Sequence, residues 1–311
     1  MRAATIRRFG GPEELSITDV PEPTPGPGEV LVRVAYAGVN PLDHKIRDGS
    51  SGLAKKLTDT DFPLILGEEC SGHVAAVGEG VAGFELGDAV FGMVPMTHGC
   101  YSEYARFPAS ALARVPVGAD LVTLGGTALA GLTAWKAVHD LAGVTRDDVV
   151  LIHGGGGGVG QLMVQLAVAT GARVHATASA RHRESITRWG AQHIDYTTTE
   201  FERAMDKPDV IIDAVYFGTY QRSVDLLQPG DRLVVLPTLA DLEPARARGL
   251  NVSVPSIQPD RDRLERLAGM IADGDLEVVV SEVLPLERVA DAHRMVESGH
   301  AVGKVVLRVG G

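Results

Sequence analysis

The 311-residue chain is poor in cysteine, in aromatic residues and in positive charge. Its two cysteines, Cys70 and Cys100, exclude a disulfide framework and a four-cysteine zinc site, and they are typical of a reducing compartment. The net charge of −11 argues against nucleic acid as a partner. No stretch approaches the roughly 20 consecutive apolar residues of a membrane span, and residues 1–8 lack the apolar core of a secretory signal. We therefore expect a cytoplasmic protein with no membrane partner.

Hydrophobic patterning divides the chain into three parts, and a chain of this length is expected to form about two domains. Residues 1–120 carry short strand-like runs punctuated by Gly and Pro, which favours a small barrel or sandwich. In residues 121–257 strand-like and helix-like stretches alternate, which is typical of βαβ units and a parallel sheet. Residues 258–311 return to the first pattern.

The pattern predicts individual elements. In the middle part we expect strands at 149–153, 173–179, 209–215 and 231–236, with helices ending at 170 and covering 183–189 and 220–227. In the last part we expect a helix at 261–271, strands at 278–280 and 283–286, a helix at 287–296 and a strand at 304–309.

Five consecutive glycines, 154–158, separate an apolar strand-like run from an apolar helix-like run. The spacing G-x-G-x-x-G is typical of dinucleotide-binding loops, where backbone N–H groups at a helix N-terminus bind phosphate. A Walker-type loop would need Lys and then Ser or Thr where Gln161 and Leu162 stand, and a flexible linker would not have apolar flanks. We expect these residues to contact the cofactor: Gly155, Gly157, Gly158, Val159 and Gly160.

The end of the second strand of this unit distinguishes NAD from NADP. NAD-binding proteins place an acidic side chain there, about 20 residues past the glycines, to bind the ribose hydroxyls. Here Ser179-Ala180-Arg181-His182-Arg183 precedes the first acid, Glu184. A hydroxyl and a guanidinium would bind the additional phosphate of NADPH. The sequence thus predicts NADPH, held by Ser179 and Arg181, while Arg183 fits a solvated helix start.

The glycine loop and the segments 37–43, 66–72, 87–90, 101–104, 131–135 and 303–307 together resemble the medium-chain dehydrogenase/reductase superfamily. Within it, residues 1–309 are similar to the zinc-free quinone oxidoreductase (zeta-crystallin-like) and alkenal/enone reductase branch. The resemblance implies an α/β protein with a GroES-like β-barrel catalytic domain (1–120 and 258–311) and a Rossmann domain with a doubly wound parallel sheet (121–257). It further implies an NADPH-dependent reductase of quinones or α,β-unsaturated carbonyls, often a homodimer, here joined through the edge at 251–254. Glycines at 154–156 replace the usual alanines, which should loosen the loop.

The resemblance also allows a prediction about a metal site. Zinc-dependent relatives carry a cysteine where this chain has Asn40 and a histidine where it has Glu68, and both changes remove donors that zinc prefers. Cys70 and His73 would point to opposite faces of a strand, so Cys70 is expected to be a packed apolar residue. His44 alone fits a surface or cleft residue. We expect no metal.

Without a metal, reduction of an electrophilic acceptor is favoured over alcohol oxidation. We expect Asn40 and Lys45 to be catalytic: the resemblance places the Asn40 amide toward nicotinamide and substrate. Lys45 would either bind the nicotinamide ribose or stabilise the enolate oxygen, and the final proton would come from water. By resemblance, Thr133, Tyr196 and Lys304 contact the cofactor. Asp43 and Asp88 fit structural acceptors for backbone N–H groups.

Two other functions stay open. A pathway-specific enoyl reductase, acting on a carbon–carbon double bond, would share these features and differ only in its pocket. A non-catalytic NADPH-binding protein would keep the glycine loop and lose the cleft residues, and the presence of Asn40 and Lys45 argues against it. A short-chain reductase is disfavoured because no Tyr-x-x-x-Lys motif occurs.

Overall fold

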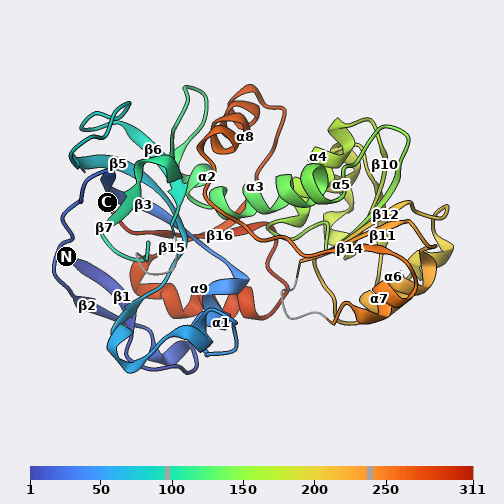
Figure 1. The fold of residues 1–311 in the computed structure, drawn as a ribbon, viewed down its shortest axis with the longest axis horizontal. Helices are drawn as coiled ribbons and strands as arrows, with labels where there is room; N and C mark the ends of the chain where they lie inside the picture. The colour runs from blue at the N-terminus through green and yellow to red at the C-terminus, as the bar shows by residue number, and fades with distance from the viewer. Residues whose placement is uncertain (95–98, 237–240, 311) are drawn as a thin grey trace. The chain divides into compact units, whose positions relative to one another are not determined.

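The computed structural model describes residues 1–94, 99–236 and 241–310 and forms two compact units (Figure 1). Unit 1 comprises residues 1–132 and 258–311, and unit 2 comprises residues 133–257. Both chain termini therefore belong to unit 1. No helix in the described parts of the chain combines the length and the apolar character needed to cross a membrane.

Unit 1 is built from antiparallel β-structure with few helices. Its strands are β1 (Arg2–Ile6), β2 (Ser16–Asp19), β3 (Glu29–Val39), β4 (Leu64–Ile65), β5 (Glu69–Val77), β6 (Ala89–Met93), β7 (Tyr104–Pro108), β8 (Leu112–Arg114), β15 (Val280–Pro285) and β16 (Lys304–Arg308). One sheet has the order β2-β1-β4, and a second runs β15-β16-β3-β5-β6-β8 with β7 also paired to β3. This is the β-rich, GroES-like unit that the resemblance implies.

The helices of unit 1 are α1 (Pro41–Arg47), α2 (Leu121–Gly125), α8 (Arg261–Asp273) and α9 (Val289–Glu297), and α3 (Ala128–Trp135) spans the boundary between units. Helix α2 packs on β3 and β5 and therefore belongs to unit 1. The boundary after Leu132 consequently lies later in the chain than the expected end at residue 120.

Long β3 organises the core of unit 1. Its side chains Val30, Val32 and Val34 are buried in one hydrophobic cluster with Phe107 and Leu112. Strand β16 pairs antiparallel with β3, with Val305 opposite Val39 and Leu307 opposite Ala37. Strand β16 thus joins a sheet that begins in the first forty residues, and the pairing satisfies backbone N–H and C=O groups along β3.

Unit 2 is a six-stranded parallel sheet. Its strands are β9 (Val149–His153), β10 (Arg173–Ala178), β11 (Gln192–Asp195), β12 (Val210–Asp213), β13 (Arg232–Val235) and β14 (Asn251–Ser253). The order is β11-β10-β9-β12-β13-β14, the 3-2-1-4-5-6 order of a doubly wound dinucleotide-binding fold. Helices α4 (Gly160–Ala169) and α5 (Arg183–Arg188) lie on one face, and α6 (Tyr220–Leu226) and α7 (Glu243–Ala247) on the other (Figure 1).

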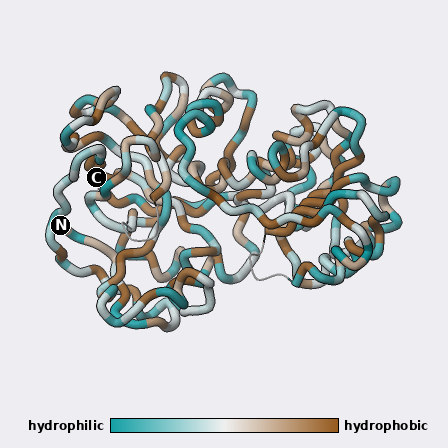
Figure 2. Tube along the Cα trace, in the orientation of Figure 1, coloured by the Kyte–Doolittle hydropathy of each residue, from teal (hydrophilic) through white to brown (hydrophobic). Residues whose placement is uncertain are grey.

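Helices on both faces bury the central strands completely. Leu151, Ile152, Ile211 and Ile212 have no solvent-exposed surface. Figure 2 shows the corresponding concentration of hydrophobic residues along these strands. Continuous apolar runs are typical of such strands because neither face meets water.

The predicted elements of unit 2 agree with the structure to within about two residues. In unit 1, one strand, β15, replaces the two expected at 278–280 and 283–286, and α9 begins at Val289 after a 3-10 turn at Leu286–Arg288. Helix α1 was not expected. Pro41 occupies its first position, where the missing N–H costs nothing, and Asn40 is its N-cap.

Candidate active site

The glycine loop connects β9 to α4 in unit 2. Gly155 N–H donates to the Thr177 carbonyl and Gly157 N–H to the Gly154 carbonyl, each at 3.0 Å. A Cβ on Gly160 would lie 1.9 Å from the Gly154 oxygen, so only glycine lets α4 begin there. Around a Cβ on Gly157 the nearest atom is 3.4 Å away. The N–H groups of Gln161, Leu162 and Met163 donate to the carbonyls of Gly157 and Val159, so the loop closes the first turn of α4. The N-terminus of a helix that follows such a glycine loop is typical of phosphate-binding sites.

Two further glycines of the loop, Gly154 and Gly156, stand where the geometry leaves little room for a side chain. Gly154 has φ of +78°, a conformation that side chains rarely adopt. A Cβ on Gly156 would lie 2.3 Å from the Cγ of His182, which is buried against the loop. These two glycines therefore make room for the backbone turn and for an imidazole, and the expectation that glycines at 154–156 loosen the loop stays a prediction.

The residues predicted to bind the additional phosphate lie side by side. Ser179 directly follows β10, and Arg181 Nε donates to Ser179 Oγ at 3.2 Å. In the register of β10 and β11, Ala178 pairs with Asp195, so Ser179 and Tyr196 leave the sheet at the same edge. Tyr196 is 57% exposed. Burial, and then the nearby Arg181 and His193, lower the pKa of His182.

Thr133 lies on α3 and is half-buried. Its contact with the cofactor stays a prediction, as do those of the glycine loop, Ser179, Arg181, Tyr196 and Lys304.

Unit 1 contains a buried group of polar side chains, here called the polar cluster: Asn40, Asp43, Glu68, Glu69, Tyr101 and Lys304. Asn40 follows β3, Glu69 begins β5 and Lys304 begins β16, so three strand ends meet there. Lys304 Nζ donates to Asn40 Oδ1 at 2.5 Å and to Glu69 Oε1 at 2.9 Å. Asn40 Nδ2 donates to Glu69 Oε1 at 2.8 Å, and Leu129 N–H to Glu69 Oε2 at 2.7 Å.

Two further carboxyls of the polar cluster, those of Asp43 and Glu68, receive fewer hydrogen bonds than the carboxylate of Glu69. Asp43 Oδ2 accepts from Asn40 N–H at 2.7 Å and from Tyr101 OH at 2.9 Å. Burial nevertheless raises the pKa of Asp43 to about 7. Burial also raises the pKa of Glu68 to about 8, and the charges of Asp43 and Glu69 add to this shift. Asp43 Oδ1 and Glu68 Oε2 are buried and have no hydrogen-bond partner within residues 1–94, 99–236 and 241–310.

The two residues predicted to be catalytic have different surroundings. Asn40, the N-cap of α1, is in the polar cluster, whereas Lys45 is exposed on α1, and the catalytic role of both stays a prediction. The lysine that meets Asn40 is Lys304. Sequence reasoning missed Glu69 and Tyr101, although the consecutive acids Glu68-Glu69 at the start of an apolar strand were a detectable signal. Asp43 and Asp88 do accept backbone N–H groups, as predicted.

The side-chain atoms around Asn40 can be compared with the ligands that a zinc ion prefers. A Zn²⁺ ion at Asn40 and Glu68, the two positions at which zinc-dependent relatives are expected to carry ligands, would compete with the Lys304 ammonium, which is 3% exposed and already donates to Asn40 Oδ1. The remaining ligands would be an amide and a carboxylate, not the thiolate and imidazole that zinc prefers. Cys70 is packed in the apolar core of unit 1, as expected.

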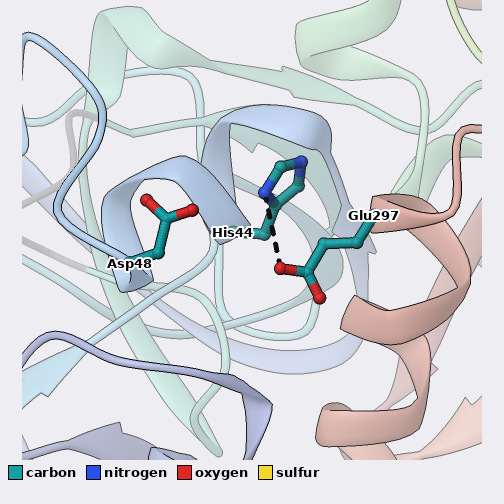
Figure 3. A group of neighbouring side chains, drawn as sticks. All are labelled: His44, Asp48 and Glu297. Atoms are coloured by element: carbon teal, nitrogen blue, oxygen red, sulfur yellow. Dashed lines mark ion pairs between the residues drawn. The ribbon is translucent and has the colours of Figure 1, made fainter.

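A second group with metal-ligand chemistry lies at the surface of unit 1. His44 and Asp48, at the two ends of one helical turn, face Glu297 of α9 (Figure 3), and their ligand atoms lie within 4.8 Å of one another. His44 Nδ1 is 3.8 Å from Glu297 Oε1, but the same oxygen accepts a hydrogen bond from the buried Arg47 guanidinium. A bound cation would compete with that guanidinium, so this group is explained as an ion-pair network.

Comparison with known proteins agrees with this architecture. Residues 26–117 match the alcohol dehydrogenase GroES-like domain, and residues 189–307 match the zinc-binding dehydrogenase family. The chain is 32% identical to 2-haloacrylate reductase of Burkholderia sp. over 98% of each protein. It is 33% identical to the chloroplastic NADPH-dependent alkenal/one oxidoreductase of Arabidopsis thaliana, over 99% of this chain and 79% of that protein. The solved quinone oxidoreductase of Coxiella burnetii superposes with a TM-score of 0.95 at 32% identity, covering 100% of this chain and 99% of that one.

Proposed function

The chain is an oxidoreductase of the medium-chain dehydrogenase/reductase superfamily, and from this membership we propose that it reduces quinones or α,β-unsaturated carbonyls with NADPH. One observation carries the proposal: the Lys304 ammonium binds Asn40, the residue at the position where zinc-dependent relatives are expected to carry a cysteine ligand. A site arranged in this way suits an acceptor that is already electrophilic, because it needs no Lewis acid to polarise an alcohol.

NADPH is favoured over NADH by the pair Ser179 and Arg181. A guanidinium hydrogen-bonded to a hydroxyl at the end of β10 offers donors for a phosphate dianion. The α4 N-terminus supports binding of the pyrophosphate. Two free, buried cysteines fit the reducing cytoplasm in which NADPH is the usual reductant pool.

NADPH, when bound, supplies a hydride. The chain's own contribution is to hold an acceptor and to stabilise the charge that develops on its oxygen. Lys304 binds the Asn40 carbonyl oxygen, which polarises the amide and strengthens its N–H groups as donors. One of those N–H groups binds Glu69, and we assign the other to the acceptor oxygen. Lys45, exposed on α1, is assigned to the ribose of the cofactor rather than to the oxygen.

The test is NADPH oxidation by the purified chain against a panel of quinones, enals, enones and acyl thioesters, with and without a zinc chelator. We expect turnover with a quinone or an enone that the chelator does not change. Turnover confined to acyl thioesters would instead identify an enoyl reductase. Tight NADPH binding without turnover of any acceptor would identify a binding protein, and loss of activity with the chelator would contradict zinc independence.

A further inference from the structure

Hydride transfer assigns no task to Glu68 of the polar cluster. Its side chain is 5% exposed, and its Oε2 is buried with no hydrogen-bond partner among the residues that the structure describes. A buried carboxylate oxygen normally receives donors, because leaving it without them costs free energy. A neutral carboxyl instead carries its own O–H donor. We propose that Glu68 is the proton donor of the reaction, a role that rests on the proposed function.

The negative charge of the polar cluster is assigned to Glu69. That carboxylate receives the Lys304 ammonium, the Asn40 amide and the Leu129 N–H. The Lys304 ammonium, which could have stabilised a second anion, is therefore already bound to Glu69. The charged groups acting on Glu68 are Asp43 from α1 and Glu69 from β5, both acidic, and with burial they hold the pKa of Glu68 near 8. At neutral pH most of Glu68 retains its proton.

Local backbone geometry places the two consecutive acids in the same cluster. Gly67 has φ of +92°, and a Cβ there would lie 2.5 Å from the Tyr101 ring. The chain therefore turns just before β5 begins at Glu69. Consecutive residues within a strand point to opposite faces. Because Glu68 lies in the turn before β5 and not within the strand, its side chain does not have to point away from that of Glu69.

The other proton-bearing groups of the polar cluster are occupied. The Tyr101 hydroxyl already donates to Asp43, and burial holds its pKa well above the ordinary value. The Lys304 ammonium bonds both Asn40 and Glu69. Asp43 Oδ2 accepts two hydrogen bonds, and although burial raises the pKa of Asp43 to about 7, that value lies below the pKa of Glu68, so Asp43 loses its proton first as the pH rises. Glu68 is therefore the carboxyl of the polar cluster that keeps its proton to the higher pH.

The step balances. Hydride adds to the β-carbon of an enone, or to a quinone, and an electron pair moves onto the acceptor oxygen. The Glu68 O–H bond then breaks, its proton forms the new O–H bond of the enol or hydroquinone, and Glu68 keeps the electron pair as a carboxylate. A solvent proton restores the acid. One NADPH and one proton are consumed for each acceptor reduced.

The test compares Glu68→Gln with wild type, using the full chain, NADPH and an acceptor that wild type reduces. We expect kcat to fall about 100-fold or more while KM for NADPH stays the same. In wild type, kcat should decline above about pH 8 as the acid is lost, and this decline should vanish in Glu68→Gln. Glu68→Asp should restore part of kcat together with a decline at high pH. Glu79→Gln, an exposed acid just past β5, is the matched control and should behave as wild type.

Infrared spectroscopy provides a readout that does not depend on turnover. Wild type at neutral pH should show a protonated-carboxyl band that is weaker in Glu68→Gln, where Asp43, with a pKa of about 7, still contributes to it. A band of equal strength in the two proteins, an unchanged kcat, or a lower kcat with the same high-pH decline would each overturn the role of Glu68. Failure of wild type to reduce any acceptor would instead overturn the proposed function, and the proton-donor role with it.

Discussion

A buried ion pair joins residues of unit 1 that are far apart in the chain. Lys304 and Asn40 are 264 positions apart in the chain, yet the Lys304 ammonium binds Asn40 directly. Its removal would leave the Glu69 carboxylate buried with only neutral donors. Removing one partner of a buried ion pair is costly because the other charge loses its compensation.

We therefore expect Lys304→Met to lower the free energy of unfolding by about 3–5 kcal/mol. Urea denaturation monitored by circular dichroism measures this change. In the double variant Lys304→Met/Glu69→Gln no buried anion remains, so its loss should be smaller than the sum of the two single losses. Additive losses would show that the two charges do not interact.

Glu68 should also make the stability of the protein depend on pH. Its pKa in the folded chain, about 8, is above the ordinary value of 4.5. Between these values the native state binds more protons than the unfolded state, so this contribution is complete below about pH 4.5 and is lost as the pH rises through about 8. Wild type should lose up to about 1.4 kcal/mol per pH unit relative to Glu68→Gln in this window. Parallel curves from urea titrations at each pH would contradict the shift.

Arg181 provides the residue-scale test of cofactor choice. Arg181→Ala removes a charged donor beside Ser179 and should reduce the preference for NADPH over NADH by about 10- to 100-fold, as expected for a hydrogen bond to a charged group. The ratio of kcat/KM for the two cofactors measures it. Arg183→Ala, an exposed neighbour at the start of α5, is the control and should leave the ratio unchanged.

At the scale of elements, the sequence predicted those helices, strands and turns that depend on residues close together in the chain. The β9–loop–α4 unit was predictable because apolar period, glycine spacing and helix start are read within a few residues. Helix α1 was not, because its seven residues show little periodicity and Asn40-Pro41 fits a turn as well as a helix start. The polar cluster was only partly predictable, since nothing local indicates that β16 brings Lys304 to Glu69.

The glycine loop allows two glycines of different role to be compared. Gly160→Ala places a methyl group on the Gly154 oxygen and should destabilise unit 2 by about 1–3 kcal/mol. Gly157→Ala meets no atom closer than 3.4 Å, so stability should change by about 0.5 kcal/mol or less while NADPH binding weakens. Thermal unfolding and fluorescence titration with NADPH separate the two effects. Equal stability losses would contradict this division of roles.

At the scale of the whole molecule, the parallel sheet of unit 2 ends at β14, which pairs only with β13 in the described sheet. An edge strand offers unpaired backbone groups to a second copy. We expect a homodimer through β14 by light scattering, and Ser253→Lys should convert it to a monomer. Gln192→Lys, on the opposite edge strand β11, is the control. A monomeric wild type would contradict the predicted dimer.

The pairing of β16 with β3 also has a consequence for synthesis. Unit 2 is continuous in the chain, whereas unit 1 needs residues from both ends. A domain can fold on the ribosome only after all of its residues have emerged. Unit 2 can therefore be complete while unit 1 still lacks β16, and Lys304 reaches Glu69 only after β16 has emerged. The nascent chain thus forms its glycine loop before it forms the buried ion pair of unit 1.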